Sequence, residues 1–456
     1  MDKLSSIAYY VTDKISSNDI SLSEYVTTDC ILQNKKGREI AINLPPQTCS
    51  LIHYQCGDVL VANIRPYLKK VWFADNDGGA SSDVLVFRAK EGHSPNFLYA
   101  LLLQDSFFDY VMKGAKGSKM PRGDKDQILR YEIPTLSCSE ESIGSYFLNI
   151  DKKIRLNEQI NQNLEAMAKQ LYDYWFVQFD FPNENGKPYK SSGGKMVWNE
   201  KLKREIPEGW EVKPINNRLE IKSGFPFKSD TYKTFGRYKI VTIKNVQDGE
   251  LVTSGCDYID ELPSRASDYI SLKTGDRLIS LTGNCGRLCV VCEENLLLNQ
   301  RVGLLYCDAT YLEYFYNFLS SNAMRTVVDN LANGAAQANL SPVELCKTDC
   351  FIPPKDILFM YNKKANTIRK TIIQNKREIS LLTKQRDELL PLLMNGQVSV
   401  NSDLAVIYVL ISTYRKVKRV YTSMAITSTF IQKSEIQIPL LRLSMFATLR
   451  SCSSMF

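Results

Sequence analysis

The sequence is poorest in histidine, and its two histidines, His53 and His93, stand in no spacing that suggests a metal site. It has only 23 glycines and 17 prolines, which argues against a disordered or fibrous chain. No stretch reaches 18 uninterrupted apolar residues, and the start lacks the basic and apolar segments of a signal peptide. The twelve cysteines show no paired spacing. We therefore expect a cytoplasmic protein with reduced thiols.

Signatures of nucleotide and methyl-transfer chemistry are also missing. The sequence contains no G-x-x-x-x-G-K-[ST] loop for a nucleotide and no N-P-P-[YF] run of the kind that holds a flipped adenine. Asp124 and Asp126 lie close together, but two carboxylates in a basic loop are commonplace. We expect no catalytic residue, no metal site and no cofactor in this chain.

The positive charge is unevenly distributed. The net charge is +7, but the residues after Asp403 carry seven Lys or Arg against one acid, Glu435, so the first 403 residues carry only +1. Any contact with a polyanion must come from local basic patches, because the body of the chain has no general positive field.

With 456 residues, 44% of them hydrophobic, the chain has room for two or three cores. An internal repeat organises it. Gly57-Asp58 precedes an apolar, β-rich run, and Gly275-Asp276 does the same 218 residues later. Ile133-Pro134 likewise corresponds to Ile352-Pro353, and each half then enters a long helical pattern. The order predicted is domain, helix, linker, domain, helix.

Both helical patterns carry a heptad seam in the same register, so the two helices are expected to pack on each other. The predicted seam residues are Ile150, Ile154, Asn157, Leu164 and Leu171 in the first helix, and Ile368, Ile372, Asn375, Leu382 and Leu389 in the second. The paired Asn157 and Asn375 either fix the register between the helices or face solvent where the helices splay. Ser137 is the expected N-cap of the first helix, and Pro391 and Gly396 are expected to kink and end the second.

The predicted fold class is α/β (α+β), with two globular domains separated by two long antiparallel helices that form a coiled coil, in a pseudo-two-fold repeat. The predicted segments are domain 1 at 1–137, helix 1 at 138–181, a linker at 182–209, domain 2 at 210–353, helix 2 at 354–397 and an atypical, poorly ordered extension at 398–456.

From Met1 to about Val400 the chain resembles the specificity subunits of Type I restriction-modification systems. The resemblance rests on the duplication itself and on the order of several segments. These are GDVLVANIRPYLKK, FDFPNENGKPYKSSGG, REIPEGWEV, GFPFKSDTYKTFGRYKIVTIKNVQDG, GDRLISLTGNCGR and LLPLLMNGQ.

The resemblance implies that each domain reads one half of a bipartite site on double-stranded DNA, while the helices set the gap and dock partners. Those partners are modification (methyltransferase) subunits, two of them expected, and restriction subunits. S-adenosylmethionine, ATP and magnesium are expected on the partner subunits. The alternatives are a silent or assembly-impaired specificity cassette that acts only as a scaffold, and a divergent single-chain restriction-methylation enzyme.

Phosphates attract Lys and Arg, whereas base edges need directional donors and acceptors, so both kinds of residue should share loops. The predicted DNA-binding residues of domain 1 are Arg65, Lys69, Lys70, Lys116, Lys119, Arg122 and Lys125, and those of domain 2 are Lys244, Asn245, Arg287, Asn333, Gln337 and Asn339. The alternative for the basic loop is a solvated surface, and the alternative for the three amides after Leu331 is capping of a turn near Ser341.

Overall fold

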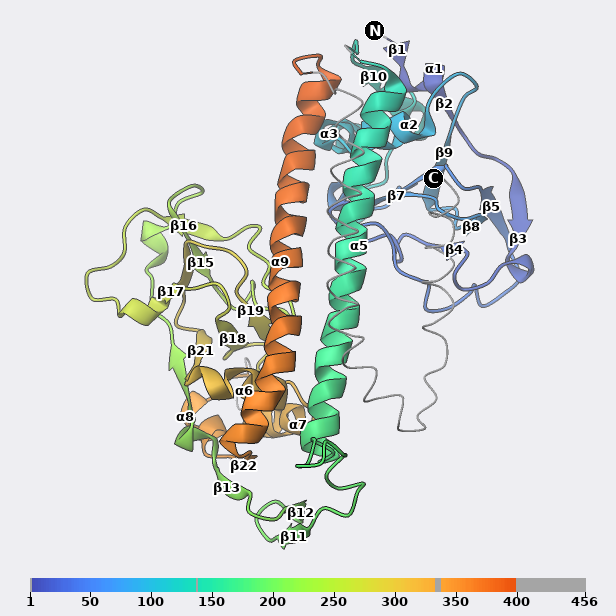
Figure 1. The fold of residues 1–456 in the computed structure, drawn as a ribbon. Coiled ribbons are helices and arrows are strands. Elements are labelled where there is room, and N and C mark those ends of the chain that lie inside the picture. Colours follow the sequence, from blue (N-terminus) through green and yellow to red (C-terminus); the bar gives the residue numbers. More distant parts are fainter. Residues whose placement is uncertain (1, 137, 333–337, 399–456) are drawn as a thin grey trace. The chain divides into compact units, whose positions relative to one another are not determined.

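The computed structural model describes residues 2–136, 138–332 and 338–398 (Figure 1). The chain divides into two compact units. Of the described residues, unit 1 comprises those up to Lys153 together with those from Arg386 to Val398, and unit 2 comprises those of Ile154–Gln385. The predicted C-terminal extension lies outside the described residues except for Val398.

The described part of unit 1 consists of short strands, short helices and one end of each long helix. Its strands are β1 (Asp2–Lys3), β2 (Ala8–Tyr10), β3 (Lys14–Ser16), β4 (Tyr25–Val26), β5 (Ser50–Tyr54), β6 (Val59–Ala62), β7 (Val71–Phe73), β8 (Gly78–Ala80), β9 (Val84–Ala89) and β10 (Glu132–Ile133). Its short helices are α1 (Leu4–Ile7), α2 (Pro95–Leu102), α3 (Asp105–Lys113) and α4 (Lys125–Ile128).

Unit 2 has a similar order of elements. Its strands are β11 (Met196–Asn199), β12 (Arg204–Pro207), β13 (Glu211–Pro214), β14 (Leu219–Ser223), β15 (Tyr238–Val241), β16 (Asp257–Ile259), β17 (Ser271–Leu272), β18 (Arg277–Ser280), β19 (Leu288–Val290), β20 (Leu296–Leu298), β21 (Val302–Cys307) and β22 (Asp349–Ile352). Its short helices are α6 (Ala309–Leu319), α7 (Asn322–Leu331) and α8 (Pro342–Cys346), and the long helices are α5 (Glu140–Tyr172) and α9 (Lys355–Met394).

The two units share most of their sheet topology, as the sequence repeat predicts. An antiparallel sheet is ordered β2-β9-β6-β7 in unit 1 and β14-β21-β18-β19 in unit 2. A second sheet contains a parallel pair, β4 with β8 or β15 with β20, and an antiparallel neighbour, β5 or β17. The units differ at one edge, because β3 extends the sheet beyond β5 whereas β16 extends it beyond β15. The architecture is mixed α/β, as predicted.

The Gly-Asp turns that revealed the repeat have the same geometry in both units. Gly57 and Gly275 have φ values of 93° and 96°, a region that favours glycine. The Asp58 carboxylate accepts a hydrogen bond from Gln55 N at 2.8 Å, and the Asp276 carboxylate accepts one from Lys273 N at 2.7 Å. Each turn therefore starts its central strand in the same way, and β6 and β18 are buried throughout.

Helix α5 begins two residues after the predicted start, and its N-cap is Ser139. The Ser139 hydroxyl accepts a hydrogen bond from Ser142 N at 3.2 Å, whereas Ser137 lies outside the described residues. Glu140 is used differently from a capping box, because its carboxylate accepts from Ser94 N at 3.0 Å, at the start of α2. The first turn of α5 is thereby attached to the globular part of unit 1.

The ends of the long helices differ from the prediction. After α5 the chain makes a π-helical turn, Asp173–Val177, and leaves the helix before Phe179, which has a φ of 63°. Helix α9 continues past Pro391 to Met394. The Pro391 ring is exposed, and the Pro391 carbonyl still accepts a hydrogen bond from Asn395 N at 3.0 Å. Gly396, with a φ of 67°, follows the helix end as predicted.

The predicted linker is a folded part of unit 2. It contains the antiparallel pair of β11 and β12, and its flanking aromatic residues join the core. Phe181 stacks on Tyr189 with ring centroids 4.7 Å apart and on Trp210 at 5.2 Å. Burying rings of this size contributes about 2 kcal/mol each, enough to order a segment rich in Pro, Gly and Ser. Among the described residues, no helix is long and apolar enough to span a membrane.

Candidate nucleic-acid interface

In unit 1 two loops lie side by side and carry most of the residues predicted to bind DNA. The loop after β6 pairs with the loop between α3 and α4 through a bridge between Ile64 and Arg122. Arg65 N donates to Pro121 O at 2.8 Å, and Lys116 and Arg122 exchange two backbone hydrogen bonds of 2.9 Å. This backbone ladder brings two segments whose paired residues, Ile64 with Arg122 and Arg65 with Pro121, are 58 and 56 positions apart onto one surface.

The charges on this surface are only partly neutralised. Lys116 binds Asp124 at 2.9 Å, which holds the pKa of that carboxyl below its ordinary value, and Arg122 lies 3.2 Å from Asp83. Within the described ranges, Arg65, Lys119 and Lys125 are exposed and make no ion pair. These three cations are available to a ligand without breaking an internal contact.

The loop after β6 has an uncommon backbone. Arg65 and Lys69 flank a 3-10 turn, Pro66–Leu68, and both have a φ of 51° in the left-handed region. Side chains other than glycine, Asn or Asp adopt this region at a cost of about 1 kcal/mol, and such residues gather at functional sites. Lys69 and Lys70 are half-buried and already bound, with Lys69 3.0 Å from Asp105 and Lys70 donating to Thr28 O. Their contact with phosphate stays a prediction, and the structure gives them another use.

Unit 2 builds the same pair of loops with different side chains. The loop after β18 pairs with the loop between α7 and α8 through Thr282 and Asn339, and Gly283 N donates to Ala338 O at 2.8 Å. Gly286 packs so closely that a Cβ there would fall 2.7 Å from Val328 Cγ1. Asn339 is exposed. Asn333 and Gln337, also predicted to bind DNA, lie outside the described residues.

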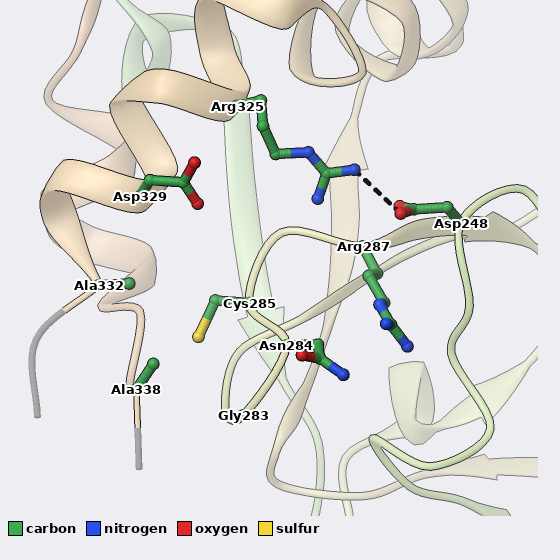
Figure 2. Close-up of a pocket in the computed structure, with 9 residues that line it drawn as sticks. All are labelled: Asp248, Gly283, Asn284, Cys285, Arg287, Arg325, Asp329, Ala332 and Ala338. Carbon is green, nitrogen blue, oxygen red and sulfur yellow. Dashed lines mark hydrogen bonds and ion pairs between the residues drawn. The ribbon is translucent and has the colours of Figure 1, made fainter. Parts of the chain in front are cut away.

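The loops of unit 2 border a pocket of about 380 Å³ (Figure 2). Its lining residues are Asp248, Gly283, Asn284, Cys285, Arg287, Arg325, Asp329, Ala332 and Ala338. Arg325 points toward Asp248 and binds it at 2.9 Å, whereas Arg287 contacts Gln247. The pocket thus offers donors of both arginines beside two carboxylates, unlike the mainly cationic surface of unit 1.

The two remaining predicted residues of unit 2 differ in availability. Lys244 is exposed. Asn245 is buried, its side-chain oxygen accepts from Thr242 N at 2.8 Å, and its amide donates to Val252 O at 2.9 Å. Asn245 therefore shapes its turn, and a base contact through it stays a prediction that requires the turn to open.

The predicted seam residues are buried or half-buried in both long helices. Those that are buried are Ile150, Ile154, Asn157, Leu164, Ile372 and Asn375, and those that are half-buried are Leu171, Ile368, Leu382 and Leu389. Asn157 and Asn375 are not paired with each other and do not face solvent. Asn157 donates to Glu378 Oε2 at 3.0 Å, and Asn375 donates to Asn161 Oδ1 at 2.9 Å. As the residue number rises along α5 it falls along α9, so within unit 2 the helices are antiparallel.

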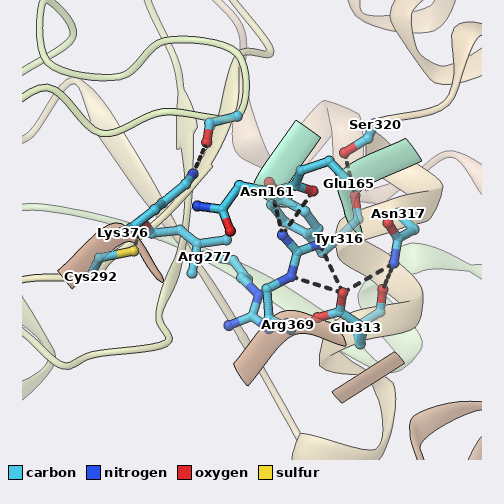
Figure 3. Close-up of polar contacts among 12 residues, drawn as sticks. Asn161, Glu165, Arg277, Cys292, Glu313, Tyr316, Asn317, Ser320, Arg369 and Lys376 are labelled. Atoms are coloured by element: carbon cyan, nitrogen blue, oxygen red, sulfur yellow. Dashed lines mark hydrogen bonds and ion pairs between the residues drawn. The ribbon is translucent and has the colours of Figure 1, made fainter. Parts of the chain in front are cut away.

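A buried ionic cluster next to this seam was missed by the sequence analysis (Figure 3). Glu313 on α6 lies between Arg277 of β18 at 2.6 Å and Arg369 of α9 at 3.0 Å, and Arg369 also binds Glu165 at 3.0 Å. Burial alone raises the pKa of Glu313, but the two guanidinium groups outweigh it and hold the pKa below its ordinary value. Charged residues inside an apolar helix pattern are the only sequence signal for this cluster.

The sequence analysis also missed Arg325 and Asp329 of the pocket. They stand four residues apart on α7, so they share one face of that helix, a spacing visible in the sequence. Asp248 carries no comparable signal, because only the fold brings its loop to α7.

No protein-family model matches the chain. It is 25% identical over 409 residues to the Type I restriction enzyme MjaIX specificity subunit of Methanocaldococcus jannaschii, covering 85% of this chain and 86% of the relative. It is 24% identical over 444 residues to the Type I restriction enzyme HindI specificity subunit of Haemophilus influenzae, covering 84% and 94%.

The fold is also similar to a solved structure. The crystal structure of a Type I restriction-modification S subunit from M. genitalium matches with a TM-score of 0.54 and 14% identity, over 88% of this chain and 96% of that chain. The resemblance predicted from the sequence is confirmed: over most of its length, this chain is similar to Type I restriction enzyme specificity subunits.

Proposed function

We propose that this chain is the DNA-reading specificity subunit of a Type I restriction-modification complex, and that each unit reads one half of a bipartite site. One observation carries the proposal: both units pair the loop after their central strand, β6 or β18, with the loop before their last short helix, α4 or α8. Similar backbones with different side chains suit two readers of different sequences.

The side chains divide into two roles. Lys119 and Lys125 of unit 1, and Lys244 of unit 2, position phosphates, because their ammonium groups are exposed point charges. Arg65 in unit 1 and Arg287 in unit 2 are suited to guanine, whose O6 and N7 accept a bidentate guanidinium. Asn339 is suited to adenine for the corresponding reason.

The long helices form the antiparallel coiled coil that sets the distance between half-sites. Their pairing inside unit 2 supports this role, and the shared sheet topology supports a pseudo-two-fold arrangement of the readers. Modification and restriction subunits supply the chemistry, with S-adenosylmethionine, ATP and magnesium bound there, and this chain itself is non-catalytic.

Co-expression with the cognate modification subunit, followed by genome-wide mapping of methylated adenines, tests the proposal. We expect a single bipartite motif. Replacement of the unit 2 domain should change one half of that motif, and lengthening α5 and α9 by a matched number of residues should change only the gap. Absence of methylation, or a domain replacement that alters both halves, refutes the proposal.

A further inference from the structure

A turn in unit 1, at residues 33–36, holds a lysine in a conformation that favours glycine. Lys36 N donates to Gln33 O at 3.4 Å, and the two central residues, Asn34 and Lys35, have φ values of 57° and 61°. Turns with two left-handed central residues favour asparagine first and glycine second. Lys35 therefore stands where glycine is expected, and its side chain strains a backbone that glycine would relax.

The Lys35 side chain is buried between two carboxylates. Its exposed fraction is 6%, and Nζ lies 2.8 Å from Asp105 Oδ1 at the start of α3 and 3.3 Å from Asp387 Oδ1 of α9. Lysine is almost never fully buried unless it is paired. Asp105 also binds Lys69 at 3.0 Å, so one carboxylate holds cations from two loops. Burial raises the pKa of Asp105, but the two lysines outweigh it and hold the pKa below its ordinary value.

The same turn supports the loop after β6, which carries Arg65. Asn34 N donates to Leu68 O and Lys35 N donates to Lys69 O, both at 2.9 Å. At its start this loop is bound through Arg65 N to the loop between α3 and α4, and at its end it is bound to the turn. The backbone on both sides of its 3-10 turn is therefore fixed by segments distant in sequence.

We propose that Lys35 is a positioning residue for the reading of DNA by unit 1. Its ammonium group holds the turn at residues 33–36, and with it the loop after β6, against α3 and α9, and so fixes where Arg65 meets the duplex. The inference rests on the proposed function, because the place of Arg65 matters only if Arg65 reads DNA. A reading side chain must be held to within about 0.5 Å of its productive place by the residues that support it. Lys35 is buried and acts through the loop.

Two substitutions separate the ammonium group from the turn. Lys35→Met keeps most of the side-chain volume and removes the charge. It leaves no buried charge unpaired, because Asp105 keeps Lys69 at 3.0 Å and Asp387 keeps Arg386 at 3.0 Å. Lys35→Gly keeps the backbone of the turn, which favours glycine, and removes the whole side chain.

Competition binding by the chain assembled with its modification subunits is the measurement. The duplexes carry the motif that methylation mapping gives for the parent, with one mismatched base pair in either half-site. The half-site read by unit 1 is the one that survives replacement of the unit 2 domain. Lys14→Met is the matched control, because it removes the same charge from an exposed residue of β3 in unit 1.

We expect both Lys35 variants to lose about tenfold of the discrimination at the half-site read by unit 1. Discrimination at the other half-site, and at both half-sites in the control, should stay within about twofold of the parent. The slope of log K against log salt on DNA without the motif should not change, because Lys119 and Lys125 are untouched.

A Lys35 variant that folds and keeps the parent discrimination overturns the proposal. So do variants that relax both half-sites alike, or the failure of both variants to fold, since each result gives Lys35 a role other than positioning this loop. A parent complex without discrimination at either half-site is a different outcome: it refutes the proposed function, and the inference falls with it.

Discussion

The structure separates the cations of unit 1 that are available to DNA from those that are not, and this separation predicts a salt dependence. Lys119 and Lys125 are exposed, as is Arg65, and none of the three makes an ion pair among the described residues. Lys69 is bound to Asp105 at 3.0 Å, and Lys70 donates to Thr28 O. Lys119 and Lys125 are the two assigned to phosphates, so changing both to alanine should weaken DNA binding far more than changing Lys69 and Lys70 to alanine.

The magnitude follows from counterion release. Each phosphate contact contributes about 0.9 to the slope of log K against log salt, so losing the two contacts of Lys119 and Lys125 should flatten the slope by about 1.8. Between 50 and 200 mM salt this corresponds to roughly a 12-fold smaller loss of affinity. Lys69→Ala with Lys70→Ala should leave the slope unchanged, although it removes an ion pair and a hydrogen bond from the loop.

Fluorescence anisotropy on duplex DNA, with the chain assembled with its modification subunits, measures both slopes. Binding at fixed temperature to DNA without the target site isolates the phosphate contribution. A Lys119→Ala, Lys125→Ala variant with the parent slope would refute the reasoning. So would a Lys69→Ala, Lys70→Ala variant whose slope falls by two contacts, because the ranking rests on the ion pairs and exposures of these side chains.

Other predictions concern the pocket, the acid stability of unit 2 and the start of α5. Arg287→Ala should relax one position of one half-site in methylation mapping, while Lys244→Ala should weaken binding to all sequences alike. The pKa of Glu313 is depressed in the folded state. The contribution of Glu313 to stability is therefore present above its unfolded pKa of about 4.3 and is lost as the pH falls. Arg369→Met should move acid unfolding to higher pH. Gly144→Ala places a Cβ 2.3 Å from Phe97 N and should cost about 3 kcal/mol in denaturant unfolding, whereas Ser139→Ala, which removes the N-cap hydroxyl of α5, should cost about 1 kcal/mol.

The duplication and its elements could be predicted because they depend on local patterns. The Gly-Asp turns need a left-handed glycine and a short carboxylate, so Gly57-Asp58 and Gly275-Asp276 are visible in any copy of the turn. The helical seam depends on a spacing that survives many substitutions, and the residues it selected are buried or half-buried. The bounds were less predictable, since the turn after Tyr172 depends on aromatic packing and Pro391 is tolerated where its ring is exposed.

The candidate site was less predictable, because residue type alone does not say which way a side chain points. Lys69, Lys70 and Asn245 have the chemistry of DNA-binding residues, yet the fold uses them for internal contacts. Arg369 was missed for the opposite reason, since it stands next to the predicted seam residue Ile368 and is the more buried of the two.

The same reasoning explains why one topology can hold two readers of different character. The backbone ladder between paired loops fixes where side chains emerge, and it uses amide and carbonyl groups that every residue except proline supplies in full. Side chains on the loops can therefore change from the cations around Arg122 to the mixed charges around Arg287 with no change in the ladder. Contacts with the long helices are different. Tyr99 of α2 donates to Asp151 of α5, and Glu313 of α6 binds Arg369 of α9, so each contact depends on the charge of its partner. Within one unit, then, the loop side chains can vary, whereas the residues of α2 and α6 that contact the long helices are constrained by their partners.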